Sequence, residues 1–191
     1  MPRHPELSLG ILAGGAGRRV GGRDKGWIEI DGRPAIERLV DRFRGEVAEI
    51  VVSANRTLER YRALGLRVVG DTEPGHPGPL AGVVALLAAT HTRWLLTLPV
   101  DLVAVPGDFL DRIAAALPAA GDADADRRVV VVHDDDGCQP LFAAYPRRLA
   151  DEAQRAFAAG ERSVMRWQAA LATTALRLPG TLGNRNLPGP G

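Results

Sequence analysis

The chain has 191 residues but only one cysteine, Cys138. A single thiol cannot form an internal disulfide, and it excludes metal sites that are built from several cysteines. The sequence also lacks any apolar run near the ~20 residues that a membrane-spanning helix needs. Its short polar start does not resemble a secretory signal peptide. We therefore expect a cytoplasmic protein in a reducing environment, with no membrane as a partner.

An excess of charge of one sign is missing as well. The 24 Lys and Arg residues balance 23 Asp and Glu residues, which leaves a formal net charge of +1. Non-specific binding to nucleic acids or membrane surfaces depends on a strong positive field, which this composition does not provide. We expect small-molecule substrates and no nucleic-acid partner.

Internal repeats and linker-like segments are absent too. The length suits one domain with one sizeable core, and 46% hydrophobic and 25% charged residues are ordinary values for a globular protein. We predict a single domain over residues 1–191 and a monomer. From about residue 187 the chain reads Leu-Pro-Gly-Pro-Gly, which predicts a short irregular tail.

Lysine is almost absent, because 23 of the 24 basic residues are arginine and only Lys25 is not. Lys25 ends a stretch, residues 12–25, that contains five glycines and three arginines and follows an apolar run. Glycines let backbone N–H groups approach a ligand closely, and a concave row of such groups binds phosphate. Arg18, Arg19 and Lys25 add full positive charge. The stretch therefore predicts a phosphate-binding loop.

Strand-like and helix-like segments alternate along the chain, which predicts an α/β fold with three layers: a mostly parallel sheet with helices on both faces. Asp108 is placed to cap one of the helices. The expected strands are 7–12, 50–53, 67–69, 94–98, 129–132, 141–145 and 173–178, with a short extended piece at 27–30. The first expected helix starts at Pro34, and five further helices are expected over 58–64, 80–89, 107–117, 147–159 and 163–171.

Three segments should meet at one edge of this sheet, because ligands of such folds bind beyond the carboxyl ends of the strands. They are the glycine-rich stretch, the loop 70–79 and Asp101, which follow the first, third and fourth strands. A phosphate-binding loop beside a carboxylate suggests a nucleotide with Mg²⁺, which one or two carboxylates usually hold. Neither a P-loop nor a dinucleotide-binding glycine fingerprint is present.

Several other polar or aromatic residues have simple structural interpretations. From its residue type alone, Asp71 is expected to open a turn, and Asn184 and Asn186 are ordinary turn residues. The run Asp134-Asp135-Asp136 predicts a solvated turn, because consecutive side chains in a loop rarely converge on one ion. The three tryptophans, Trp27, Trp94 and Trp167, fit a core better than a base-stacking site.

The stretch 12–25, Leu-Ala-Gly-Gly-x-x-x-Arg-x-x-Gly-x-Asp-Lys, closely resembles the signature of the nucleotidyltransferases that make molybdenum cofactor dinucleotides, above all their guanylyltransferase branch. The resemblance covers nearly the whole chain and implies a Rossmann-like nucleotidyltransferase fold. It continues through Asp31-Gly-Arg-Pro34, Val52-Ser-Ala-Asn-Arg56, Asp71, Gly78-Pro-Leu-Ala-Gly82, Leu98-Pro-x-Asp101, Gln139-Pro-Leu141, Gly160-Glu-Arg162 and Asn184-x-Asn186.

The resemblance also implies a role for each matching residue. Mg²⁺ would bind Asp101, and Asn184 and Asn186 would face the pterin substrate. Ser53 stands at a nucleotide contact where the family more often has asparagine. The remaining nucleotide site would comprise Leu12, Ala13 and Gly14 as backbone contacts, Gly15, Arg19, Gly22 and Lys25 around the triphosphate, Asp71, and the loop glycines Gly78 and Gly82.

The reaction implied by this resemblance uses GTP and molybdopterin, or the molybdenum cofactor, as substrates. The terminal phosphate of the pterin attacks the α-phosphorus of GTP, pyrophosphate leaves, and Arg19, Lys25 and Asp101 are the catalytic residues. Three alternatives stay open: an enzyme that uses CTP on the same pterin, a sugar-phosphate nucleotidyltransferase, and a non-enzymatic carrier of GTP or pterin. Other cofactor-biosynthesis proteins and molybdoenzyme chaperones are further candidate partners.

Overall fold

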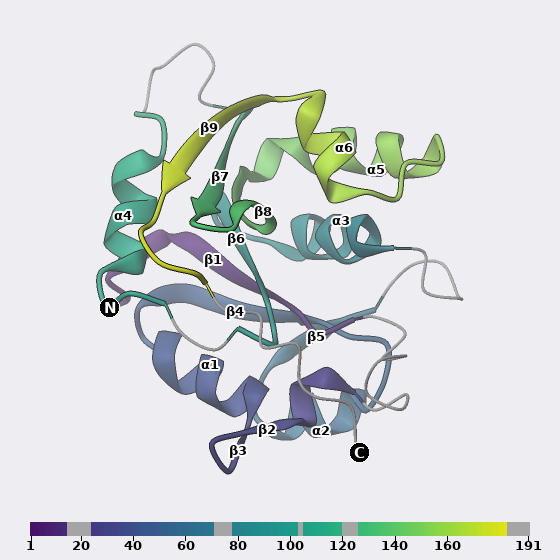
Figure 1. The fold of residues 1–191 in the computed structure, drawn as a ribbon. Coiled ribbons are helices and arrows are strands. Elements are labelled where there is room, and N and C mark those ends of the chain that lie inside the picture. The colour runs from purple at the N-terminus through teal and green to yellow at the C-terminus, as the bar shows by residue number, and fades with distance from the viewer. Residues whose placement is uncertain (15–23, 71–77, 103–104, 120–125, 183–191) are drawn as a thin grey trace.

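The computed structural model describes residues 1–14, 24–70, 78–102, 105–119 and 126–182. Their centre is a seven-stranded sheet with the order β5-β4-β1-β6-β8-β7-β9 (Figure 1). Each expected strand is present. The strands are β1 (His4–Leu12), β4 (Val47–Ser53), β5 (Arg67–Val69), β6 (Trp94–Pro99), β7 (Arg128–Asp134), β8 (Gly137–Pro146) and β9 (Ala172–Arg177).

The direction of the strands confirms a mostly parallel sheet. Strands β5, β4, β1 and β6 run parallel to one another, and β9 runs parallel to β7. Only β8 is antiparallel, both to β6 and to β7. β7 and β8 form a hairpin around Asp135 and Asp136, so β7 ends at the same edge of the sheet as β1 and β6.

The helices are α1 (Ala35–Phe43), α2 (Leu58–Ala63), α3 (Pro79–Ala89), α4 (Phe109–Ala116), α5 (Ala150–Ala158) and α6 (Val164–Ala169), with 3₁₀ turns η2 (Lys25–Trp27) and η3 (Arg147–Leu149). A small hairpin of β2 (Glu29–Ile30) and β3 (Arg33–Pro34) precedes α1. No described helix has the length and apolarity that crossing a membrane would take.

Two hydrophobic cores flank the sheet and produce the predicted three layers (Figure 1). One core joins α1, α2 and α4 to the sheet and includes Leu96, while the other joins α3, α5 and α6 and includes Leu95. These two neighbours in β6 face opposite cores because successive side chains of a strand point to opposite faces. Both faces of the central strands are therefore covered.

Two local predictions were confirmed only in part. Asp108 precedes α4, but its side chain does not cap the helix; its carboxylate instead accepts a hydrogen bond from Arg112 Nε at 2.8 Å. The segment 27–30 is only partly extended, because Lys25–Trp27 forms a 3₁₀ turn and the strand begins at Glu29.

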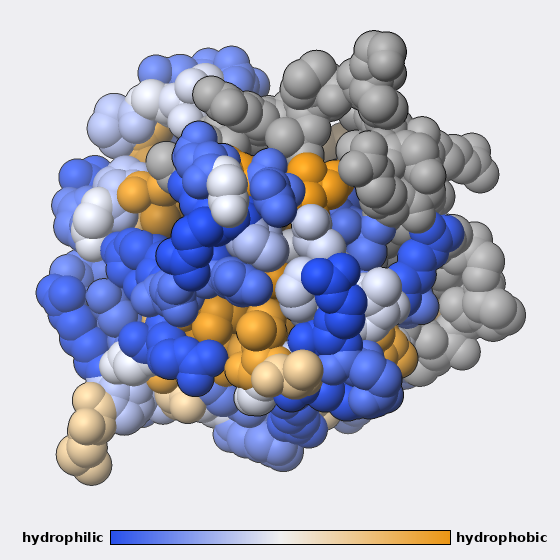
Figure 2. Space-filling view, turned by 90° about the horizontal axis from the view of Figure 1, so that it is seen from below, coloured by the Kyte–Doolittle hydropathy of each residue, from blue (hydrophilic) through white to orange (hydrophobic). Residues whose placement is uncertain are grey.

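The tryptophans and the surface follow the expected division of apolar and polar residues. Trp94 and Trp167 are buried, and Trp27 is partly buried against the core around α1. Seen from the side of α1 and α2, the surface is mainly hydrophilic, with a group of apolar side chains visible between polar ones (Figure 2).

Candidate active site

Three parallel strands end at the same level. Leu12, the last residue of β1, pairs in register with Ser53 of β4 and with Pro99 of β6. The ladder continues one step further, because Ala13 N–H donates to the Ser53 carbonyl at 2.9 Å and Val100 N–H donates to the Leu12 carbonyl at 3.1 Å. The chain segments that leave β1 and β6 are therefore neighbours at one edge, as the topology predicted, whereas most of the third predicted segment, the loop 70–79, lies outside the described residues.

Lys25 and Asp101 meet at this edge. Lys25 Nζ lies 2.9 Å from Asp101 Oδ2, although the two residues are 76 positions apart in the chain. The exposed fractions are 39% for the lysine side chain and 16% for the aspartate, so the pair is open to solvent on one side. A cation and a carboxylate that a ligand can reach are thus placed together beside the end of β1.

Ser53 lies beneath the first residues of the glycine-rich stretch. It is 1% exposed, and its hydroxyl has no hydrogen-bond partner in the part of the chain that the structure describes. A Cβ on Gly82 would lie 2.9 Å from both Ser53 Oγ and Leu12 Cδ2. The absence of a side chain at position 82 therefore lets α3 pack directly against the ends of β1 and β4.

The start of α3 is fixed by a loop from far along the chain. Gly78 has a φ of 98°, and a Cβ there would lie 2.9 Å from the carbonyl oxygen of Arg162. The same carbonyl accepts a hydrogen bond from Leu80 N–H at 3.3 Å. The glycine permits both the left-handed backbone and the close approach.

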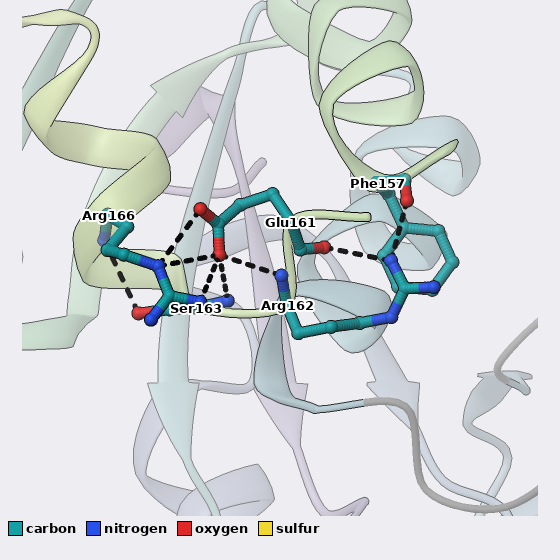
Figure 3. Close-up of polar contacts among 5 residues, drawn as sticks. All are labelled: Phe157, Glu161, Arg162, Ser163 and Arg166. Carbon is teal, nitrogen blue, oxygen red and sulfur yellow. Dashed lines mark hydrogen bonds and ion pairs between the residues drawn. The ribbon is translucent and has the colours of Figure 1, made fainter. Parts of the chain in front are cut away.

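Glu161 organises this loop (Figure 3). Its carboxylate accepts hydrogen bonds from the backbone N–H groups of Arg162 and Ser163 and from the guanidinium of Arg166. The Arg166 guanidinium, together with these N–H donors, lowers the pKa of Glu161 to about 2. The Arg162 guanidinium lies over the ring of Phe157, 4.1 Å from its centroid, and donates to the Phe157 carbonyl. The loop between α5 and α6 is therefore held in place by the charged side chains of Glu161, Arg162 and Arg166.

The prediction of a solvated turn at residues 134–136 was wrong for Asp134. Asp135 and Asp136 are exposed, but Asp134 is buried and accepts hydrogen bonds from Gln139 Nε2 and from the backbone N–H of Leu182, both at 2.9 Å. Burial raises the pKa of Asp134, but these hydrogen bonds outweigh it and lower the pKa. A carboxylate at the end of β7 thus anchors the segment that leads toward the Asn-x-Asn pair.

The structure describes eight of the residues singled out by the sequence, and one residue without an assigned role lies beside Lys25. Asp24 accepts three hydrogen bonds around Lys25; its position next to the lone lysine was the signal available in the sequence. The eight are Leu12, Ala13, Gly14, Lys25, Ser53, Gly78, Gly82 and Asp101. Outside the described residues lie Gly15, Arg19, Gly22, Asp71, Asn184 and Asn186.

Asp101 supplies one partly exposed carboxylate at this edge of the sheet to which a metal ion could bind. Within the described ranges, no three His, Cys, Asp or Glu side chains form a group that could hold a metal ion. A single carboxylate nevertheless suits Mg²⁺ in a nucleotide site, because phosphate oxygens and waters complete its shell. The Asp101 carboxylate therefore fits a metal ion that arrives with a nucleotide.

Comparisons with known proteins agree with this architecture. The family model of the MobA-like NTP transferase domain matches residues 9–174. A molybdenum cofactor guanylyltransferase of Shewanella putrefaciens is 37% identical over 169 residues, which cover 88% of this chain and 83% of the relative.

Solved structures share the fold. A protein of Aquifex aeolicus has a TM-score of 0.71 at 20% identity, over 90% of this chain and 86% of its own. The molybdopterin-guanine dinucleotide biosynthesis protein A of Archaeoglobus fulgidus has a TM-score of 0.63 at 23% identity, over 90% and 83%. With the family model covering most of its length, the chain belongs to the MobA-like NTP transferase domain family and is a nucleotidyltransferase.

Proposed function

We propose that this protein transfers GMP from GTP to the terminal phosphate of molybdopterin, or of the molybdenum cofactor, and releases pyrophosphate. The product is the guanine dinucleotide form of the cofactor. The observation that carries the proposal is the meeting of Lys25 and Asp101 beside the glycine-rich stretch, in a chain whose relatives are named molybdenum cofactor guanylyltransferase.

The proposed reaction requires little acid–base catalysis from the protein. The attacking phosphate is already an anion near neutral pH, so the reaction needs no strong general base. Positioning and charge neutralisation then account for most of the rate. The ammonium of Lys25 neutralises charge that grows on the leaving pyrophosphate, and Arg19 supports it.

Asp101 has the role of holding the metal ion in this proposal. Enzymes of this family typically use a divalent metal, and we assign Mg²⁺ to the Asp101 carboxylate at the end of β6. When bound, the ion supplies Lewis-acid polarisation of the α-phosphate. Before substrate binds, Asp101 and Lys25 compensate each other's charge. Binding of the nucleotide gives each of them a new partner, and the ion pair opens.

The remaining roles stay predictions from the resemblance. The backbones of Leu12, Ala13 and Gly14 contact the nucleotide, with Ser53 and Asp71 nearby, while Gly15 and Gly22 complete the triphosphate loop. Asn184 and Asn186 face the pterin, and the glycines at 78 and 82 shape the adjacent loop.

The surroundings of the reaction follow from its substrates. We propose GTP and molybdopterin as the immediate partners, with other cofactor-biosynthesis proteins and molybdoenzyme chaperones as candidates for handing over substrate and product. A single, exposed cysteine suits the reducing cytoplasm. The single domain over residues 1–191 and the monomeric state are part of the same proposal.

A direct assay tests the proposed reaction. The protein is incubated with Mg²⁺, with either molybdopterin or a sugar phosphate, and with GTP, CTP or ATP. Pyrophosphate and the nucleotide-linked product are both measured, with Asp101→Asn as a variant of lowered activity. Pyrophosphate release that requires GTP and molybdopterin supports the proposal. Release with CTP alone would identify the cytidylyl enzyme, release only with sugar phosphates the sugar-phosphate enzyme, and binding without release a carrier.

A further inference from the structure

Asp24, the residue before Lys25, lies at the centre of a hydrogen-bond cluster. Its Oδ1 accepts from the Tyr61 hydroxyl at 2.6 Å and from Gly26 N–H at 3.0 Å, and its Oδ2 accepts from the Thr57 hydroxyl. These donors come from the 3₁₀ turn of Lys25 itself, from the start of α2 and from the interior of α2. The carboxylate therefore ties the turn to a helix that is remote in sequence.

Tyr61 is the donor to this carboxylate that comes from the interior of α2. It is fully buried, and burial together with the neighbouring Asp24 carboxylate raises the pKa of its phenol far above the ordinary value. The phenol therefore stays protonated and can act as the donor to Asp24. A Cβ on Gly26 would lie 2.2 Å from the Tyr61 oxygen, so the turn rests directly on the tyrosine and only glycine fits.

The next residues strengthen the same attachment. Trp27 Nε1 donates to the Thr57 hydroxyl at 3.0 Å, and its ring packs 5.1 Å from the Tyr61 ring and 3.8 Å from the Arg60 guanidinium. Thr57 itself has a φ of 47°, a left-handed conformation that is unusual for a β-branched residue. Backbone strain of this kind persists only where the surroundings hold it.

Lys25 is the member of the turn that points elsewhere. Residues 24, 26 and 27 are all attached to the α2 region, whereas the Lys25 ammonium reaches Asp101. A lysine side chain is long and flexible, so its charge is preorganised only when its backbone is fixed. Asp24 already accepts three donors, and it holds the backbone without taking the ammonium for itself.

We propose that Asp24, through Tyr61 and Thr57, is the positioning residue that fixes the Lys25 ammonium opposite Asp101. The proposal rests on the proposed function only for the consequence in catalysis; the placement of Lys25 can be measured without any substrate. Misplacing a reacting group by about 1 Å can cost roughly 10²-fold in rate, and this sets the scale of the expected effect.

The first experiment uses Lys25 as its own reporter. Protein labelled with ¹³C,¹⁵N-lysine gives signals from one residue only, because the chain has no other lysine. We expect the wild-type side chain to show restricted motion and a shifted ε-methylene signal. In Asp24→Asn, the signal moves toward that of free lysine and its motion increases, while Tyr61→Phe gives a smaller change in the same direction.

The matched control is Asp111→Asn, which removes a half-exposed carboxylate that lies against Arg3 and His4 near the start of β1. We expect it to leave the lysine signals unchanged. Folding of each variant is checked by circular dichroism. If Asp24→Asn does not fold, Tyr61→Phe decides in its place, because it removes one donor and keeps the carboxylate. Unchanged lysine signals in the folded variant would overturn the proposal.

The second experiment is a double-mutant cycle on kcat. A residue that acts through Lys25 has no further effect once Lys25 is gone. We expect Asp24→Asn to lower kcat by about 10²-fold in the wild type and to change it little in the Lys25→Ala background. Equal losses in both backgrounds would make Asp24 merely structural. If no GMP transfer occurs but the lysine signals respond, the proposed function fails and the positioning stands.

Discussion

Lys25 Nζ and Asp101 Oδ2 lie 2.9 Å apart, so the only ammonium side chain of the protein and the carboxylate after β6 neutralise each other across the edge of the sheet. Neither is buried completely, with exposed fractions of 39% and 16%. Pairs of this kind contribute little to stability because solvent screens them. Their placement is therefore better explained by what each group does when a ligand separates them.

Lys25→Ala should damage turnover more than folding. Loss of one preorganised charge at a developing oxyanion typically lowers kcat by about 10²–10³-fold. The measurement is kcat at saturating GTP. Lys25→Arg is the informative companion, because a planar guanidinium cannot take the place of a compact ammonium in the same turn. Wild-type kcat in Lys25→Ala would remove Lys25 from the mechanism.

Asp101→Asn should weaken the Mg²⁺-dependent activity and leave the fold intact, since Asp101 lies past the end of β6 rather than in a core. Activity is titrated against Mg²⁺ for wild type, Asp101→Asn and the distant control Asp111→Asn. We expect a higher half-saturating Mg²⁺ concentration only in the first variant. The same titration curve for all three proteins would mean that another group holds the ion.

Gly82→Ala should destabilise the protein. The new methyl group would lie 2.9 Å from Leu12 Cδ2 and from Ser53 Oγ, and overpacking of this kind costs about 1–3 kcal/mol. Urea unfolding compares it with Gly107→Ala, where a Cβ meets nothing within 4 Å. Equal stability of the two variants would show that α3 can move away from the ends of β1 and β4 without cost.

Glu161 should make stability depend on pH in acid. Its pKa falls from 4.5 in the ordinary state to about 2 in the folded protein, chiefly through Arg166. Below about pH 4.5 the unfolded chain binds a proton that the folded chain does not, so stability is lost as the pH falls toward about 2.

The comparison for this effect is between wild type and Glu161→Gln, with Glu59→Gln as an exposed control. Melting temperatures are measured from about pH 6 downward. The advantage of wild type over Glu161→Gln should be constant above about pH 4.5 and should shrink below it. A difference that does not change with pH would contradict the lowered pKa.

GTP should be preferred over CTP in kcat/KM. Guanine presents an N1–H and N2–H₂ donor edge with an O6 acceptor, and a site that pairs with these groups has its own polar groups left unsatisfied when cytosine binds. Discrimination by hydrogen bonds can reach about 10⁴-fold, although Ser53 in place of asparagine favours a smaller value. The values for GTP, CTP and ATP are measured with one pterin. A CTP value equal to that for GTP would assign the protein to the cytidylyl branch.

The alternation of apolar segments was enough to predict the layers of the fold, because burial on both faces of a parallel sheet requires it. The carboxyl edge was predictable for the same reason: strands that run parallel must end together, which brought the segments after β1 and β6 to one place. The lone lysine in a glycine-rich stretch predicts a phosphate site from its residue types alone, and this stays a prediction.

Tertiary structure alone decided which polar groups meet. The sequence does not indicate that Asp24 serves as an acceptor for Tyr61, that Asp134 is buried beneath Leu182, or that the Arg162 carbonyl receives the start of α3. These contacts join residues 37, 48 and 82 positions apart, counting Leu80 with Arg162. Whether a hydrogen bond forms depends on differences of a few tenths of an ångström in the distance between donor and acceptor. The packing of helices against the sheet sets those distances. Local sequence patterns carry only periodicity and turn chemistry.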